Sequence, residues 1–255
     1  FDAALAEQEA GLAREPDFRP ARYERALLLL RSYAERIEQR RSAWWRERGE
    51  LLARDGSGQV RAAERRQPEA RELEDEAARE LRERAAEDVR RFSAPAAEGD
   101  DARAACAAGV LALAEGRLAE GRSELARALE GDPDLEEAYE AQAQLERAQG
   151  RLAEAIAAYA RGIEHDRGYV PFRDGRAAAW LTEAESREAS GGDPGPALEA
   201  AIADATEGLR LAPDRFRSWY LRARARTRHA ALAGWAGRPR DEEMQAGLGD
   251  FGEAI

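Results

Sequence analysis

The feature that most constrains the fold of this chain is an internal repeat with a period of 34 residues. The segment Gly116-Arg117-Leu118-Ala119-Glu120 recurs as Gly150-Arg151-Leu152-Ala153-Glu154. Two stretches with helical apolar periodicity flank each Gly-Arg pair, and glycine tolerates the left-handed conformation that ends a helix. Each repeat is therefore predicted to be a helix, a tight turn and a second helix. The same shift carries further positions onto one another: Leu111 onto Leu145, Leu125 onto Tyr159, Ala128 onto Gly162, Leu129 onto Ile163 and Asp132 onto Asp166.

This layout resembles the tetratricopeptide-repeat (TPR) family, in which repeats of about 34 residues have a proline after the second helix. The resemblance covers 102–255 as a TPR array, and 1–17 resembles the second helix of a truncated leading repeat. It implies an all-α fold, an α-solenoid of helix-turn-helix repeats. Other matching residues are Leu198, Ala201, Ile202, Gly208, Leu209, Pro213 and Asp214, and a last repeat, truncated in mid-helix, begins with Phe251, Ala254 and Ile255.

The C-terminal repeats depart from this period. Ala201, Asp204 and Ala205 recur as Gly247, Asp250 and Phe251 after 46 residues. The additional residues fall at the turn inside each hairpin, in 190–196 and 234–239. We expect them to lengthen either the helices or that turn.

A larger departure is the segment 18–95, for which we predict a long antiparallel helical hairpin, a degenerate or extended repeat. A helix of about 34 residues, or roughly 50 Å, is predicted before the break at 55–58, and a second one from Pro68. The two halves have opposite charge: ten Arg against six acids over 31–66 (+4), and six Arg against twelve acids over 69–101 (−6). The apolar stripes that we expect to pair are Tyr23, Leu27, Leu30, Ala34, Ile37, Trp44 and Leu51 with Leu73, Ala77, Leu81, Ala85, Val89 and Phe92.

Composition excludes several classes of function. The formal charge of −11 argues against a general nucleic-acid binder, which needs a basic face. No apolar run is long enough to cross a membrane. The single cysteine, Cys106, rules out an internal disulfide and is compatible with a reducing compartment, so we expect a cytoplasmic location. All 40 basic residues are Arg, with no Lys or Asn, which indicates the codon bias of a high-GC, bacterial genome.

No catalytic, cofactor-binding or metal-binding residue is predicted. The string Gly247-Leu248-Gly249-Asp250-Phe251-Gly252 matches Gly-x-Gly-x-x-Gly and contains Asp-Phe-Gly. A dinucleotide site needs a preceding strand, and a kinase needs a Lys and a His-Arg-Asp segment, both of which this chain lacks. We interpret the string as part of a repeat's second helix. His165, His229 and Cys106 lack the spacing of metal ligands or of a catalytic pair.

The TPR resemblance implies a partner-binding groove lined by the first helix of each repeat, which receives a peptide or helix. The alternative for these residues is an ordinary solvated helix face. The two-carboxylate clamp of some TPR domains uses Lys and Asn, so its usual form is excluded. For Trp44-Trp45, both an exposed partner patch and burial under the hairpin remain open. The positions assigned to the groove are Arg103, Cys106, Val110, Glu137, Glu140, Gln144, Arg147, Asp174, Ala178, Arg217, Tyr220, Arg224 and Arg228.

The leading hypothesis is a non-catalytic scaffold that binds a protein or peptide partner. The alternative is a regulatory or scaffolding region of a larger enzyme, because Arg-rich repeats with long hairpins resemble those that follow bacterial Ser/Thr protein kinases. The chain begins at Phe1 without Met and ends in mid-pattern at Ile255, so we read it as a piece of a longer protein. A self-contained enzyme is disfavoured, since no constellation for catalysis is found.

Overall fold

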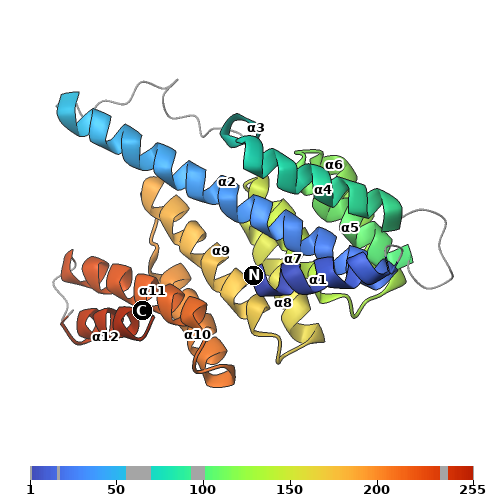
Figure 1. Cartoon of the computed structure of the whole chain (residues 1–255). Helices are drawn as coiled ribbons and strands as arrows, with labels where there is room; N and C mark the ends of the chain where they lie inside the picture. Colours follow the sequence, from blue (N-terminus) through green and yellow to red (C-terminus); the bar gives the residue numbers. More distant parts are fainter. Residues whose placement is uncertain (1, 16–17, 56–69, 93–100, 236–240, 255) are drawn as a thin grey trace. The chain divides into compact units, whose positions relative to one another are not determined.

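A computed structural model describes residues 2–15, 18–55, 70–92, 101–235 and 241–254, and all regular structure in these ranges is α-helical. The helices fall into two compact units, 1–135 and 136–255, and each is described by itself. The predicted all-α class is therefore confirmed (Figure 1). Several predictions fall outside the described residues: those on Phe1, Pro16, Asp17, Pro68, Ile255, the 56–58 break, residues 236–239, and the side chains of Trp45 and Leu51.

The first unit contains α1 (Asp2–Arg14), α2 (Arg19–Asp55), α3 (Ala70–Leu73), α4 (Glu76–Phe92), α5 (Asp101–Ala114) and α6 (Leu118–Gly131). Helices α2 and α4 pack antiparallel, as the prediction of a long hairpin requires (Figure 1). Tyr23 near the start of α2 stacks obliquely on Phe92 at the end of α4. Arg36 and Arg40, farther along α2, bind Asp75 just before α4.

The stripes of this hairpin differ from the prediction in three places. Ala34 and Ala77 are exposed, whereas Tyr33 and Ala78 lie in the core beside them. The second arm is also divided, because Asp75 accepts a hydrogen bond from the backbone N–H of Ala78 (2.9 Å) and so starts a new helix. A continuous heptad pattern does not reveal such a cap. Trp44 is half-buried and packs against the same cluster.

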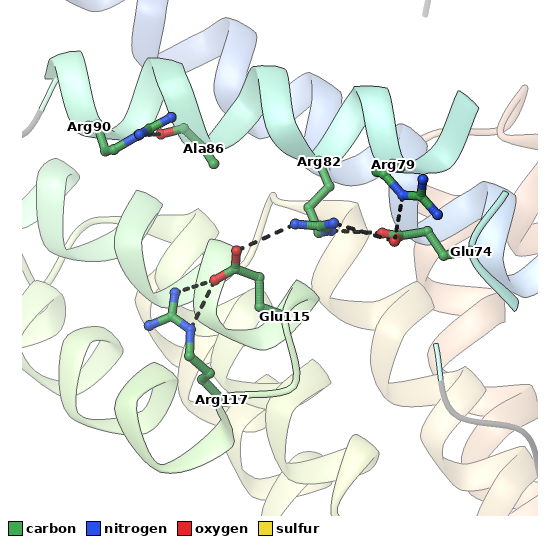
Figure 2. Close-up of polar contacts among 7 residues, drawn as sticks. All are labelled: Glu74, Arg79, Arg82, Ala86, Arg90, Glu115 and Arg117. Atoms are coloured by element: carbon green, nitrogen blue, oxygen red, sulfur yellow. Dashed lines mark hydrogen bonds and ion pairs between the residues drawn. The ribbon is translucent and has the colours of Figure 1, made fainter. Parts of the chain in front are cut away.

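Figure 2 shows how charged side chains connect this hairpin to the next one. Arg82 of α4 binds Glu74 at 2.7 Å and lies 3.6 Å from Glu115, which follows α5. Glu115 in turn accepts a hydrogen bond from Nε of Arg117 (2.9 Å) at the start of α6. The carboxylate of Glu115 thus lies between two guanidinium groups. These contacts fix the orientation of α4 relative to the α5–α6 turn.

The second unit contains α7 (Glu136–Ala148), α8 (Leu152–His165), α9 (Val170–Ala189), α10 (Gly195–Leu211), α11 (Phe216–Trp235) and α12 (Asp241–Glu253). They form three hairpins in chain order, and consecutive hairpins pack against each other. The additional residues of the 46-residue repeat lengthen α9, α10 and α11 to 20, 17 and 20 residues, against 13 and 14 in α7 and α8. The Gly247–Gly252 string lies within α12, as interpreted from the sequence.

The predicted glycine turns have the expected geometry. Gly116 and Gly150 have φ of +76° and +71°. The N–H of the following residue bonds to a carbonyl five residues earlier: Arg117 to Ala112 (2.8 Å) and Arg151 to Glu146 (3.0 Å). This pattern satisfies the last carbonyls of the first helix and requires a residue that tolerates positive φ.

The three longer hairpins share a buried Asp on the second helix that binds Arg of the first helix. Asp88 of α4 binds Arg22 and Arg25, and Asp204 of α10 binds Arg176. Asp250 of α12 binds Arg222 and Arg226 in the same way. Each Asp follows a small residue by three positions: Ala85, Ala201 and Gly247, respectively. The pairs fix how the two long helices face each other.

Candidate functional site

The first helices of the second unit, α7, α9 and α11, carry the charged and aromatic side chains of the candidate site. Between α9 and α11 lies a cavity of about 370 Å³ lined by Leu181 and Glu188 of α9 and by Arg224, Thr227 and Arg228 of α11. This cavity contains two of the arginines that the sequence assigned to the groove. It is large enough for one or two side chains of a partner.

Ion pairs cross this cavity from α11 to α9. Arg228 donates to Glu185 at 3.0 Å and also binds Glu188, while Arg224 donates to Glu185 at 3.3 Å. These side chains are partly exposed, so each pair contributes little to stability. The arginines are therefore paired with glutamates and still accessible to a ligand.

An aromatic group lies on α11 beside the same arginines. Phe216 and Tyr220 are exposed and stack nearly parallel, with ring centroids 6.2 Å apart. Phe251 of α12 contacts Tyr220 edge-on, and the guanidinium of Arg224 lies 5.8 Å from the centre of the Tyr220 ring. Adjacent exposed aromatic and cationic groups are typical of surfaces that bind other proteins.

Tyr159, a buried residue of α8, is influenced by charges from α7 and α11. Burial raises the pKa of Tyr159 to about 12, and the nearby charges of Arg147, Glu140 and Arg217 act on it as well. The ring lies over Gly175 of α9, where an added Cβ would come within 2.3 Å of it. The absence of a side chain at Gly175 therefore leaves room for the Tyr159 ring.

The face formed by these groups is balanced in charge. On α7 and α9 it carries Glu137, Glu140, Glu185 and Glu188, and its arginines are Arg147, Arg217, Arg224 and Arg228. Among these four acids and four bases, Arg224 and Arg228 bind the acids of α9. Such a surface matches a ligand of mixed charge better than a uniformly charged one.

The structure corrects two of the groove assignments. Cys106 is fully buried in α5, because the Ala-rich α5 packs against α2, α4 and α6. Asp174 is buried as well, since it accepts hydrogen bonds from Arg215 (2.5 Å) and Ser218 (2.5 Å) and so faces the next hairpin. Neither side chain is available to a partner.

The remaining assigned positions are at least partly accessible, but they lie in both units. In the first unit Arg103 is exposed and Val110 is half-buried against the core. In the second, Gln144 donates a hydrogen bond to Glu140 (3.3 Å). Glu137, Ala178 and the α11 residues are half-buried or exposed. The second unit by itself brings together the groups on α7, α9 and α11.

Sequence reasoning missed Glu185 and Glu188 at the cavity, and it missed the packing of the buried Tyr159 over Gly175. The two glutamates continue the helical spacing of Ala178 along the extra turns of α9, which the 34-residue template does not contain. Extending the template by those turns would have found them. No sequence signal shows that the Tyr159 ring passes over Gly175, because this contact depends on how two helices pack.

Within the described ranges, no group of three or more His, Cys, Asp or Glu side chains is arranged to hold a metal ion. No helix in those ranges is long and apolar enough to cross a membrane.

The chain is similar to known proteins in structure, and the matches are solved structures of other proteins. No family model matches the chain, and no curated protein matches it by sequence. A monomeric IFIT1 mutant, solved with Gppp-AAAA, aligns over 99% of this chain with a TM-score of 0.61 and 13% identity. The chain spans 45% of the length of that IFIT1 chain. The fold is TPR-like.

Two other solved structures are similar in part. MamA aligns over 69% of this chain and 91% of its own, with 14% identity and a TM-score of 0.48. YrrB, described as a TPR protein with an unusual peptide-binding site, aligns over 97% and 90% with 11% identity and a TM-score of 0.43. The TPR-like assignment rests on the IFIT1 alignment together with the repeats and turns described above.

Proposed function

We propose that this chain is a non-catalytic interaction module whose second unit binds a peptide or helix of a partner protein along α7, α9 and α11. The observation that carries the proposal is the cavity beside Arg224 and Arg228, next to the exposed Phe216 and Tyr220. An aromatic group that buries apolar area, beside guanidinium groups that bind carboxylates, combines two contributions that are important at protein interfaces.

The charge pattern favours a partner protein over RNA. IFIT1 is solved with an RNA ligand, and Tyr220 beside Arg224 resembles a stacking site for a base. Glu185 and Glu188, however, already bind Arg224 and Arg228, and their carboxylates would repel phosphate. A peptide with both acidic and basic residues can exchange ion pairs with both sides of the cavity.

The proposal is tested with the double variant Arg224→Glu/Arg228→Glu. Partners captured by the immobilised wild-type chain are identified by mass spectrometry, and each is then titrated as a purified protein. We expect the variant to lower the affinity at least tenfold, because each reversal places a carboxylate beside those of α9.

The control is Arg127→Glu/Arg161→Glu, which makes the same change in net charge at exposed positions on α6 and α8. It should bind as the wild type does. Unchanged affinity of the Arg224/Arg228 variant, or an equal loss of affinity in the control variant, would contradict the proposal. Tighter binding of single-stranded RNA than of any protein would replace it with the RNA alternative.

The wider setting proposed is a regulatory or scaffolding region of a larger multidomain enzyme, such as a bacterial Ser/Thr protein kinase. This setting rests on the resemblance of the Arg-rich repeats and the long hairpin to the repeats that follow bacterial Ser/Thr protein kinases. Sequencing the gene on either side of the segment tests it: a catalytic domain in the same reading frame supports it, a kinase domain most specifically, and a reading frame without any catalytic domain contradicts it.

A further inference from the structure

A second cavity in the second unit lies away from the α9–α11 cavity. Its volume is about 650 Å³, and it is formed where the C-terminal ends of α8 and α10 meet the first turns of α9. Ile163, Glu164 and Arg167 come from the end of α8 and the turn after it, Arg173 from α9, and Glu207, Arg210 and Leu211 from α10. This volume falls within the range of sites that bind small ligands or peptide side chains.

The three arginines of this cavity differ in how they are bound. Arg210 is occupied by Glu207 through two contacts of 2.7 and 2.8 Å. Arg173 donates to the backbone carbonyl of Arg167 (3.2 Å), and its buried Nε has no acceptor within the described part of the chain. The Arg167 side chain forms no hydrogen bond or ion pair with any described residue. Neither Arg167 nor Arg173 therefore forms an ion pair with a carboxylate of the described residues. The pKa of Glu207 is lowered by its hydrogen bond with Arg210 and, to a smaller extent, by the charge of Arg173.

Arg173 is held in place before any ligand arrives. Its bond to the Arg167 carbonyl restrains the side chain, so binding loses less conformational entropy there than at a free surface arginine. Its buried Nε lacks an acceptor that a ligand could supply. Fixed guanidinium groups favour planar oxyanions, which they bind through two parallel hydrogen bonds.

The charge of the lining indicates which oxyanion fits. Arg167, Arg173 and Arg210 contribute +3 and Glu164 and Glu207 contribute −2, which leaves +1. One carboxylate neutralises this charge, whereas a phosphate monoester of about −1.5 to −2 at neutral pH would leave the site negative. Ile163 and Leu211 add an aliphatic wall beside the charges.

We propose that this cavity is a second binding site, for a peptide segment in which an acidic side chain stands next to an aliphatic one. The carboxylate binds Arg167 and Arg173, and the aliphatic side chain packs on Ile163 and Leu211. The site is separate from the proposed face on α7, α9 and α11, and its occupancy does not depend on that face.

The experiment uses two libraries of acetylated decapeptides, one of Leu, Ala, Ser and Glu and one with Gln in place of Glu, passed over the immobilised whole chain. We expect the wild type to enrich Leu-Glu or Glu-Leu pairs from the first library and nothing from the second. The variant Arg167→Glu should lose this enrichment and weaken the best peptide at least tenfold. Because Arg167 is exposed and its side chain has no partner in the described ranges, the variant should fold as the wild type does.

Three comparisons make the result specific. Arg173→Gln should also weaken the peptide, whereas Arg161→Glu, on α8 but outside the cavity, should not. Arg224→Glu/Arg228→Glu should leave this peptide bound, which separates this site from the proposed function. The proposal is overturned by equal enrichment of Gln peptides, by full affinity in Arg167→Glu, or by inorganic phosphate displacing the peptide at lower concentration than acetate does.

Discussion

At the scale of single residues, the buried carboxylates of the long hairpins stand out. Asp88 is fully buried and binds two guanidinium groups, one of them also nearly buried. Removing one partner of such a group leaves uncompensated charge in the interior, which costs far more than losing an exposed ion pair. The repeated Asp204 and Asp250 are visible in the sequence. Their Arg partners cannot be picked out from the sequence, because the chain contains 40 Arg residues.

We predict that Asp88→Ala lowers the free energy of unfolding by about 3 kcal/mol or more, because Arg22 and Arg25 lose their carboxylate. Urea denaturation followed by circular dichroism measures this change. The control is Glu183→Gln, which breaks a partly exposed pair with Arg187 on one helix and should cost about 0.5 kcal/mol or less. Equal costs for the two variants would contradict the account of Asp88.

A second prediction concerns Tyr159. Burial raises its pKa to about 12, against about 10 in the unfolded chain. The folded state therefore favours the neutral phenol, and this contribution is complete below pH of about 10 and is lost as the pH rises towards 12. We expect Tyr159→Phe to lose less stability than the wild type over that interval.

The chain suits this measurement because it has no Lys, so few groups besides the six tyrosines and Cys106 titrate in that range. Urea denaturation at several alkaline pH values gives the stability curves. Phenolate absorbance of the folded proteins gives the pKa directly. A titration of Tyr159 near pH 10, seen as the difference between wild type and Tyr159→Phe, would be inconsistent with its burial.

At the scale of helices, glycine has opposite effects at two positions of α12. Gly249 is exposed, and an added Cβ would meet nothing within 4 Å, whereas at Gly247 it would lie 2.7 Å from Cγ2 of Thr227. We predict that Gly249→Ala raises the free energy of unfolding by about 0.5–1 kcal/mol and that Gly247→Ala lowers it. Thermal and urea denaturation of the two variants check both signs.

Helix α4 provides a prediction at acidic pH. The hydrogen bonds from Arg36 (2.7 and 2.8 Å) and then the N–H of Ala78 hold the pKa of Asp75 far below its ordinary value. A lowered folded-state pKa means that the stabilisation is present above the unfolded pKa of about 3.9 and is lost as the pH falls further.

We therefore expect Asp75→Asn to be less stable than the wild type at neutral pH and to lose less stability on acidification below about pH 4. The Asn side chain keeps the cap on Ala78 but not the charge, so the helix itself should persist. Parallel stability curves for the two proteins over this range would contradict the role of Asp75.

Most of the helices were predictable, and the exceptions have physical reasons. Gly116 and Gly150 identify their turns in the sequence, because each turn needs a residue with positive φ and glycine is the residue that adopts it readily. The division between α3 and α4 was missed, because the cap at Asp75 lies inside an otherwise regular apolar pattern. The sequence did not decide whether the extra residues of the 46-residue repeat lengthen the helices or the loops. Either change gives the same spacing between the matching residues of the two repeats.

At the scale of the whole molecule, the TPR-like fold follows from the repeat, but the candidate site follows only in part. Arg224 and Arg228, assigned to the groove by their position in the repeat, line the cavity. Glu185 and Glu188, which bind them, lie on helical turns that the family template lacks. Cys106 and Asp174 were misplaced because helix α5 and the contact between α9 and α11 bury them. The division at 17, 95 and 102 remains a prediction, and the structure separates its two units after residue 135.

The central claim is that a partner protein binds across α7, α9 and α11 of the second unit, and site-specific photo-crosslinking tests it most directly. A benzoylphenylalanine replaces Tyr220 on α11 in one variant and Glu154 at the exposed start of α8 in another. After irradiation with a purified partner, we predict a crosslinked product for the variant at 220 and none for the variant at 154. Crosslinking at 154 alone, or equally at both positions, would contradict the claim.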